Sequence, residues 1–96
     1  MRIDVTMDDL VERDGLYYKR FTDVPFDGEV TGKEQGSFSD GMKDGPWVSY
    51  WTNGQLLSKG TYKDGKSEGP WVWYNKDGTV FKSFTGTYKD GEKISD

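Results

Sequence analysis

The sequence contains no cysteine and no histidine in its 96 residues. The lack of cysteine excludes disulfide bonds and is consistent with a reducing compartment. Without these two residue types the chain cannot build a Ser–His–Asp triad, a Cys–His nucleophile, or a zinc site with thiolate or imidazole ligands. We therefore expect a protein that is not an enzyme and that uses no cofactor and no metal.

Long apolar runs are missing as well. No stretch approaches the roughly 18 apolar residues that a transmembrane helix needs. Residues 1–9 have no apolar segment of the kind found in a signal peptide. We accordingly expect neither a signal peptide nor a membrane span, and we expect the protein to act in the cytoplasm.

Basic residues are fewer than acidic residues. The chain has 17 acidic and 13 basic residues, which gives a net charge of −4. Nucleic-acid binding needs a basic surface, so a nucleic-acid partner is excluded. The excess of acidic residues also disfavours binding to an anionic membrane surface. A protein partner with a neutral or basic surface fits the charge better.

Aromatic residues are abundant by contrast. Only 32% of the residues are hydrophobic, but aromatic residues alone make up 16% of the chain. Each buried aromatic side chain removes roughly 150–250 Å² from water, so a few of them can stabilise a thin fold. A chain of this length forms one domain with a small core. We expect that domain to span residues 1–96.

The chain repeats itself. Residues 36–48 recur as residues 60–72, a spacing of 24 residues, and a third copy begins at Gly86. A fixed period of this length indicates one supersecondary unit stacked on its neighbours. We predict four units. The first unit contains two strand-like segments, residues 16–21 and 28–32. The units are a degenerate N-terminal unit (10–35), two repeats (36–59 and 60–85) and a truncated repeat (86–96).

Turn signals divide the repeats into short segments. Asn53-Gly54 and Asp77-Gly78 are the dipeptides most typical of two-residue type I′ hairpin turns. The segments 40–45 and 64–69 predict longer loops. Only Met7 to Glu12 could form a short helical turn. The expected fold is all-β: a single elongated, twisted antiparallel sheet, built as a meander of serial β-hairpins.

A two-residue turn at Asn53-Gly54 also fixes the pairing of the flanking strands. Tyr50 would then face Leu57, and Trp47 would face Gly60. A bulky ring over a strand glycine is a known packing device, because it covers the gap left by the missing side chain. We therefore predict that the Trp47 ring packs over Gly60.

The alternation of strand side chains sorts the apolar residues onto two faces. One face is predicted to form the core. The other face would form a stripe that either binds protein or is covered by curling of the sheet or by the N-terminal segment. The predicted core residues are Trp47, Trp51, Tyr62, Trp71, Trp73, Phe84 and Tyr88, and the predicted binding residues are Tyr50, Leu57, Tyr74 and Phe81.

Two pairs of acidic residues recur, Asp40 with Asp44 and Asp64 with Glu68. Paired carboxylates could serve a glycosidase or bind calcium. The favoured interpretation is that Asp precedes Gly because it tolerates turn geometry, and that the second acid is a solvated charge. In a binding surface, these four acids would be charges at the rim.

The repeat unit reads G-x-[FY]-x-D-G-x-x-[DE]-G-P-W-V-x-Y and is followed by Asn-Gly or Asp-Gly. It resembles the variant MORN repeat. Residues 10–18 and 25–32 also resemble the head segment of the bacterial YwqK-type antitoxin proteins. This resemblance implies serial β-hairpins and a non-enzymatic role as a scaffold or as the immunity partner of a toxin. It supplies no catalytic residues.

Three functions follow from these features. The leading hypothesis is a protein-binding module, an antitoxin or immunity protein that occludes a cognate toxin with a basic surface. The alternative is a structural module that forms homo-oligomers through an edge strand or through the second face. Lipid binding is the least favoured, because the chain has no basic cluster.

Overall fold

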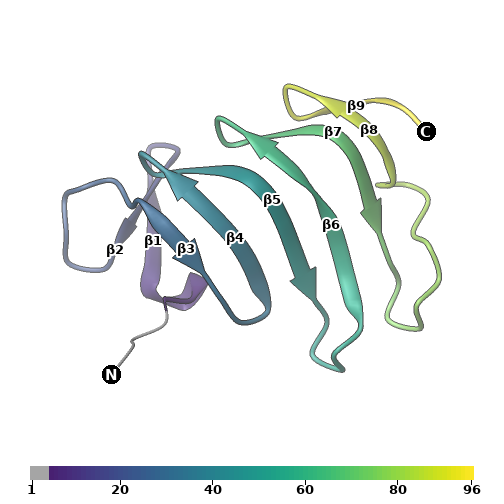
Figure 1. Cartoon of the computed structure of the whole chain (residues 1–96), viewed down its shortest axis with the longest axis horizontal. Helices are drawn as coiled ribbons and strands as arrows, with labels where there is room; N and C mark the ends of the chain where they lie inside the picture. Colours follow the sequence, from purple (N-terminus) through teal and green to yellow (C-terminus); the bar gives the residue numbers. More distant parts are fainter. Residues whose placement is uncertain (1–4) are drawn as a thin grey trace.

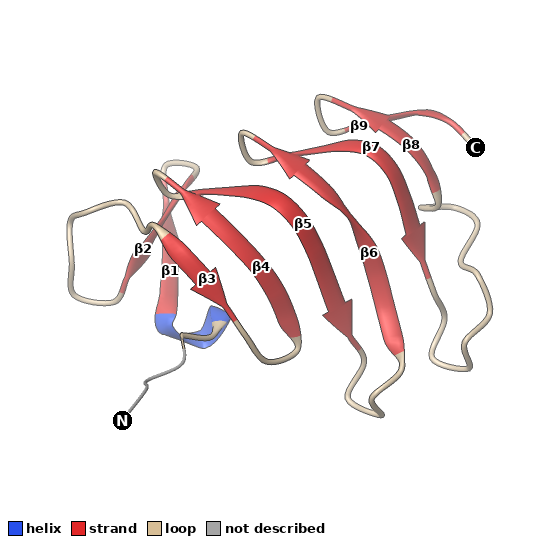
Figure 2. Cartoon of the chain, viewed as in Figure 1, coloured by secondary structure: helices blue, strands red, loops and turns tan. Residues whose placement is uncertain are grey.

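A computed structural model describes residues 5–96 and shows an open antiparallel sheet (Figures 1 and 2). Seven strands pair in chain order from β3 to β9, and β1 and β2 form a separate two-stranded hairpin. The predicted all-β meander is therefore confirmed, with the first hairpin as an addition. The strands are β1 (Leu10–Arg13), β2 (Leu16–Lys19), β3 (Gly28–Val30), β4 (Glu34–Ser39), β5 (Met42–Tyr50), β6 (Leu56–Lys63), β7 (Lys66–Trp73), β8 (Gly86–Lys89) and β9 (Glu92–Ser95).

The N-terminal segment differs from the sequence expectation. The only helical residues described are a 3-10 turn, Met7–Asp9, and Leu10 already begins β1, so the predicted helical turn is three residues long. The predicted strand over residues 16–21 ends at Lys19. Residues 1–4, part of the segment in which we expect no signal peptide, lie outside the described residues. No helix in the described part of the chain is long and apolar enough to cross a membrane.

Tight turns of the sheet form at the first Asp-Gly pair of each full repeat. Asp40-Gly41 and Asp64-Gly65 have positive φ at both residues, as a type I′ turn requires. Their flanking residues pair directly across each turn. The predicted long loops over 40–45 and 64–69 are therefore wrong. Aspartate tolerates the left-handed conformation, so Asp-Gly closes the hairpin in two residues.

The Asn53-Gly54 turn was predicted wrongly as well. Gly54 N donates to Trp51 O at 3.0 Å and Trp51 N donates to Gln55 O at 2.8 Å, which closes a three-residue loop. The side chain of Asn53 explains the difference, because its Oδ1 accepts from Gln55 N at 2.9 Å. That local bond competes with the two-residue turn geometry.

The Asp77-Gly78 turn has the same form. Gly78 N donates to Asn75 O at 3.0 Å, and Asn75 N donates to Thr79 O at 2.7 Å. Asp77 Oδ1 accepts from Thr79 N at 3.0 Å, as Asn53 does in the preceding repeat. The hydrogen bonds from Thr79 also hold the pKa of Asp77 below its ordinary value. Both turns at this end of the strands are therefore three-residue loops.

The longer loop changes the strand register locally. Tyr50 pairs with Leu56, so the predicted Tyr50–Leu57 pair is wrong, and Leu57 forms a bulge. The predicted pairing of Trp47 with Gly60 is nevertheless confirmed. The extra loop residue shifts the register by one, and the bulge shifts it back.

Two strand glycines at equivalent positions of the repeats, Gly36 and Gly60, are each covered by an indole ring. A Cβ built on Gly36 would lie 2.0 Å from Trp47 Cε3, and one built on Gly60 would lie 2.0 Å from Trp71 Cδ2. The ring over Gly60 thus belongs to Trp71, not to Trp47 as predicted. Trp71 also donates from Nε1 to Thr61 O at 3.0 Å. The bulges that carry Gly45 and Gly69, both at positive φ, turn each indole toward the preceding strand.

A row of aromatic rings runs along one face of the sheet. We call it the aromatic ladder, and its rings Phe38, Trp47 and Trp71 belong to the buried core. Successive ring centroids lie 4.9–6.1 Å apart, and all but one pair meet edge to face. Such pairs stabilise by about 0.5–1.5 kcal/mol each beyond their area burial. The ladder contains Tyr17, Phe38, Trp47, Tyr62, Trp71, Trp73, Phe84 and Phe81.

Two of the seven predicted core residues are buried, and three more pack partly buried against them. Trp47 and Trp71 are each 2% exposed. Tyr62, Trp73 and Tyr88 pack partly buried against the same cluster. Trp51 is half-buried outside it, and Phe84 is 51% exposed, so its assignment to the core is wrong. The sequence analysis missed the N-terminal core residues, which are Leu10, Phe26, Val30 and Phe38.

Different segments of the chain lie at the two ends of the aromatic ladder. At one end, the β1–β2 hairpin packs against the sheet through Tyr17, whose ring meets Phe38 at 5.1 Å. Backbone bonds fasten it there: Tyr17 N donates to Gly41 O at 2.8 Å, and Phe26 N donates to Tyr17 O at 2.9 Å. At the other end, the loop between β7 and β8 lies beside the last strands (Figure 1).

The glycine–indole contact makes a direct stability prediction. Gly60→Ala would force a methyl group into the Trp71 ring, so we expect the free energy of unfolding to fall by about 1–3 kcal/mol. Gly→Ala usually stabilises a compatible site, so the sign is diagnostic. Urea unfolding measures it, with the exposed neighbour Lys59→Ala as the control. An unchanged or raised stability for Gly60→Ala would contradict the contact.

Candidate functional site

The end of the aromatic ladder away from the β1–β2 hairpin holds an open apolar cavity of about 330 Å³, which we call the end pocket. It is formed by the ends of β6 and β7 together with the β7–β8 loop. Its lining is almost entirely aromatic or aliphatic, as in pockets that bind apolar groups. The lining residues are Trp51, Leu57, Trp73, Tyr74, Asn75, Phe81 and Phe84.

Hydrogen bonds fasten the β7–β8 loop in place. Thr85 Oγ1 accepts from Trp73 N at 2.9 Å and donates to Phe81 O at 2.9 Å. Phe81 N donates to Trp73 O at 2.7 Å, and Tyr88 Oη donates to Phe84 O at 2.6 Å. The loop is therefore tied to β7 and β8 at both of its phenylalanines, and the end pocket is formed in advance.

The rings of the end pocket contact one another but leave one side open to solvent. Phe84 meets Trp73 at 5.6 Å and Phe81 at 4.9 Å between centroids. Phe81 is 36% exposed and Phe84 is 51% exposed. Trp51 is held by a bond from Nε1 to Tyr74 O at 3.1 Å. Exposed aromatic surface of this kind marks an interaction site in soluble proteins.

The structure brings together residues that the sequence analysis placed on opposite faces. Leu57, Tyr74 and Phe81, predicted to bind, line the end pocket beside the predicted core residues Trp51, Trp73 and Phe84. The predicted separation fails here because Leu57 lies in a bulge and Phe81 lies in a loop, where side chains no longer alternate. Tyr50 is half-buried and does not line the pocket.

The four predicted rim acids lie elsewhere. Asp40 and Asp64 occupy tight turns, and Asp44 and Glu68 lie on β5 and β7 near the same turns. These turns join β4 to β5 and β6 to β7 at one end of the strands (Figure 1), whereas the pocket residues Trp51 and Tyr74 directly follow β5 and β7 at their other end. Glu68 Oε2 also accepts from Asp90 N at 3.1 Å, a structural contact. The predicted acidic rim around the binding aromatics is therefore wrong.

The described residues contain no group of three or more acidic side chains placed to hold a metal ion. The recurrent pairs are instead explained by the turns. In the left-handed conformation Asp is tolerated better than most residues, which accounts for Asp40 and Asp64.

A second, polar hollow of about 160 Å³ lies at the other end of the ladder. The Lys43 side chain lines this hollow. Its Nζ lies 4.8 Å from the Trp47 ring centroid and 5.1 Å from the Tyr62 ring centroid. Burial raises the pKa of Tyr62, and the Glu34 carboxylate adds to the shift. Burial likewise raises the pKa of Tyr17. Both tyrosines pack partly buried against the core.

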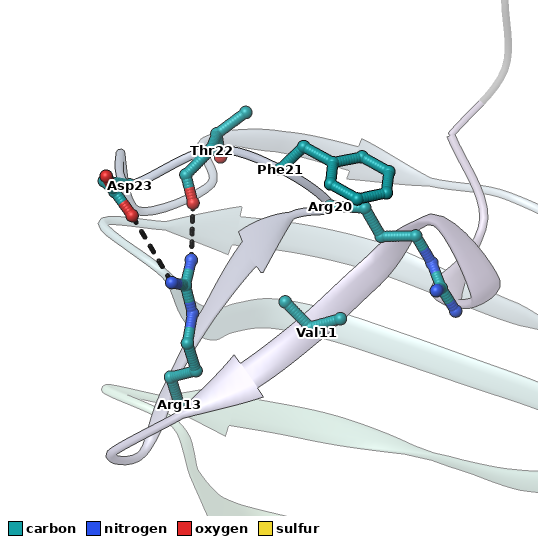
Figure 3. A pocket seen from close by; sticks show the side chains of 6 residues that line it. All are labelled: Val11, Arg13, Arg20, Phe21, Thr22 and Asp23. Carbon is teal, nitrogen blue, oxygen red and sulfur yellow. Dashed lines mark hydrogen bonds and ion pairs between the residues drawn. The ribbon is translucent and has the colours of Figure 1, made fainter.

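The third feature is the loop between β2 and β3, shown in Figure 3. It borders an open hollow of about 670 Å³. Arg13 donates from Nη2 to Thr22 O and from Nη1 to Asp23 Oδ1 at 3.4 Å. Phe21 is the second residue after β2 and is fully exposed. The sequence analysis placed Phe21 in a strand and missed this loop, because no glycine or asparagine signals its positive φ of 66°.

These features define a class of protein: a repeat protein of stacked β-hairpins with an aromatic core on one face and an open pocket at one end. A family model described as "MORN repeat variant" matches residues 43–64, which run from β5 through β6 to the next tight turn. The match supports the predicted MORN-type repeat. No curated protein and no solved structure matches the chain.

The contrast between core and pocket rings can be tested by truncation. Phe38→Ala removes a ring that is 4% exposed and should cost about 3–5 kcal/mol of unfolding free energy. Phe84→Ala removes a half-exposed ring at the pocket and should cost about 1 kcal/mol or less. Denaturant unfolding of both variants measures this. Equal losses would show that Phe84 belongs to the core after all.

Proposed function

We propose that this chain is a protein-binding module whose end pocket accepts an apolar side chain of a protein partner. The observation that carries the proposal is the end pocket itself: a preformed cavity with exposed aromatic rings, held by Thr85 and Tyr88. Aromatic residues in a desolvated pocket are the usual source of binding energy at protein interfaces. A fixed pocket also lowers the entropy cost of binding.

We further propose that the partner is a toxin and that this chain is its antitoxin or immunity protein, acting in the cytoplasm. The resemblance of residues 10–18 and 25–32 to the head segment of YwqK-type antitoxins supports this role. The net charge of −4 supports a partner with a basic cleft. Opposite charges would accelerate association and make the on-rate fall as salt rises.

The test begins with affinity capture from the native host and identification of the captured protein by mass spectrometry. The purified pair is then studied by titration calorimetry with three forms of the chain: wild type, Phe81→Ser and Ile94→Ser. Ile94 is 61% exposed and lies on β9, away from the pocket lining, so it is a matched control. We expect Phe81→Ser to raise Kd at least tenfold, as loss of an interface hot spot does.

The control should bind as wild type does. Equal Kd values for wild type and Phe81→Ser would overturn the end pocket as the binding site. The occlusion step is tested separately, by measuring the activity of the partner with and without this chain. A partner that keeps its full activity in the complex would contradict the antitoxin role.

A further inference from the structure

We infer that the end pocket binds Phe21 of a second copy of this chain, so that copies associate head to tail. The inference rests on the proposed function, since it names an occupant for the same pocket. It starts from the loop between β2 and β3, where Phe21 is 103% exposed and Val24 is 72% exposed. An aromatic ring with no covering at all is costly in water, which favours its burial against another surface.

The loop holds Phe21 outward rather than letting it fold back. Phe21 has a φ of 66°, a conformation that bulky residues adopt only when their surroundings impose it. On one side of Phe21, the Arg13 guanidinium donates hydrogen bonds to Thr22 O and to the Asp23 carboxylate, which hold the loop backbone (Figure 3). From the other side, Arg20 donates from Nε to Asp8 O at 2.9 Å. These bonds hold the backbone on either side of Phe21, so less backbone freedom is lost when the ring is bound.

The exposed apolar side chains fall into two groups at opposite ends of the molecule. Phe21 and Val24 lie on the β2–β3 loop, at the left of Figure 1. Val80, Phe81 and Phe84 lie on the β7–β8 loop at the right, beside the end pocket. The remaining exposed large apolar residue in the described part of the chain is Ile94, and single exposed residues need no explanation.

The two groups have complementary shapes. One is a projecting ring, and the other borders a cavity of about 330 Å³, at the lower limit of the roughly 300–1,000 Å³ typical of ligand pockets. A single phenyl ring is a small ligand for such a cavity. Inside it, Phe21 would meet Phe81, Phe84 and Trp73, whose rings already pair edge to face. The ring of the second copy would therefore extend the aromatic ladder by one member.

The placement of the two groups sets the form of the assembly. The longest dimension of the molecule is 39 Å, and the loop and the pocket lie at its two ends, so Phe21 cannot reach the pocket of its own chain. Each copy would use its loop on one neighbour and its pocket on another. Such a contact is heterologous and produces chains of copies, not closed dimers, unless the rotation closes a ring. Self-association would also compete with other partners for the pocket.

Sedimentation velocity over a range of concentrations tests this assembly. We expect wild type to show species larger than a dimer as concentration rises. Phe21→Ser and Phe81→Ser should each raise the self-association Kd at least tenfold, and Ile94→Ser should not change it. A mixture of the two defective variants should form a one-to-one dimer and nothing larger, because one supplies only the pocket and the other only the loop.

Disulfide trapping locates the contact, because the natural chain has no cysteine. Thr22→Cys in one copy and Lys82→Cys in another place thiols next to Phe21 and Phe81. Oxidation of the mixture should give a crosslinked heterodimer that is lost when the Thr22→Cys copy also carries Phe21→Ser. Circular dichroism of each variant confirms that it is folded.

A wild-type chain that stays monomeric at the highest concentration overturns the head-to-tail contact. So does association that persists in Phe21→Ser, or wild-type monomers that bind anionic vesicles through Phe21. In each case the loss of foreign-partner binding in Phe81→Ser still supports the proposed function, so the two proposals fail separately. Conversely, head-to-tail association without a foreign partner leaves this inference standing and removes the antitoxin role.

Discussion

The structure depends on the packing of each repeat's indole over a glycine of the preceding strand. An open sheet with one core face has no second layer to bury its side chains, so the aromatic rings must supply that layer themselves. Trp47 over Gly36 and Trp71 over Gly60 place two large rings flat against the sheet. Tyr62 fits between them, with centroids 5.6 Å and 4.9 Å away. The remaining rings of the aromatic ladder continue from this central group.

This packing also explains why the site lies where it does. The β1–β2 hairpin contacts one end of the aromatic ladder through Tyr17 and Phe38. At the other end the ladder finishes at Phe84 and Phe81, whose outer sides face solvent. The last rings of such a row are exposed unless another segment or another molecule covers them. The end pocket is thus a consequence of the repeat architecture, and this is why the proposed binding site lies there.

Much of the fold could be predicted from the sequence, because a repeat in which Gly36 and Trp47 recur 24 residues later as Gly60 and Trp71 allows few architectures. The turn types could not be predicted from the sequence. Asp64-Gly65 and Asn53-Gly54 carry equally strong turn signals, but only the first forms a two-residue turn. The outcome depends on the Asn53 side-chain bond to Gln55. The register of Trp47 with Gly60 was still predicted correctly, because the extra loop residue and the Leu57 bulge cancel.

The candidate site was predicted only in part. Leu57, Tyr74 and Phe81 were expected to bind, but side-chain alternation ends at the bulge and in the β7–β8 loop, so their neighbours were not foreseen. The most direct test of the account is the proton NMR spectrum of Gly60. Trp71 lying over this glycine predicts upfield ring-current shifts of its Hα protons and nuclear Overhauser contacts to the indole. Ordinary shifts without such contacts would contradict the packing on which the structure depends.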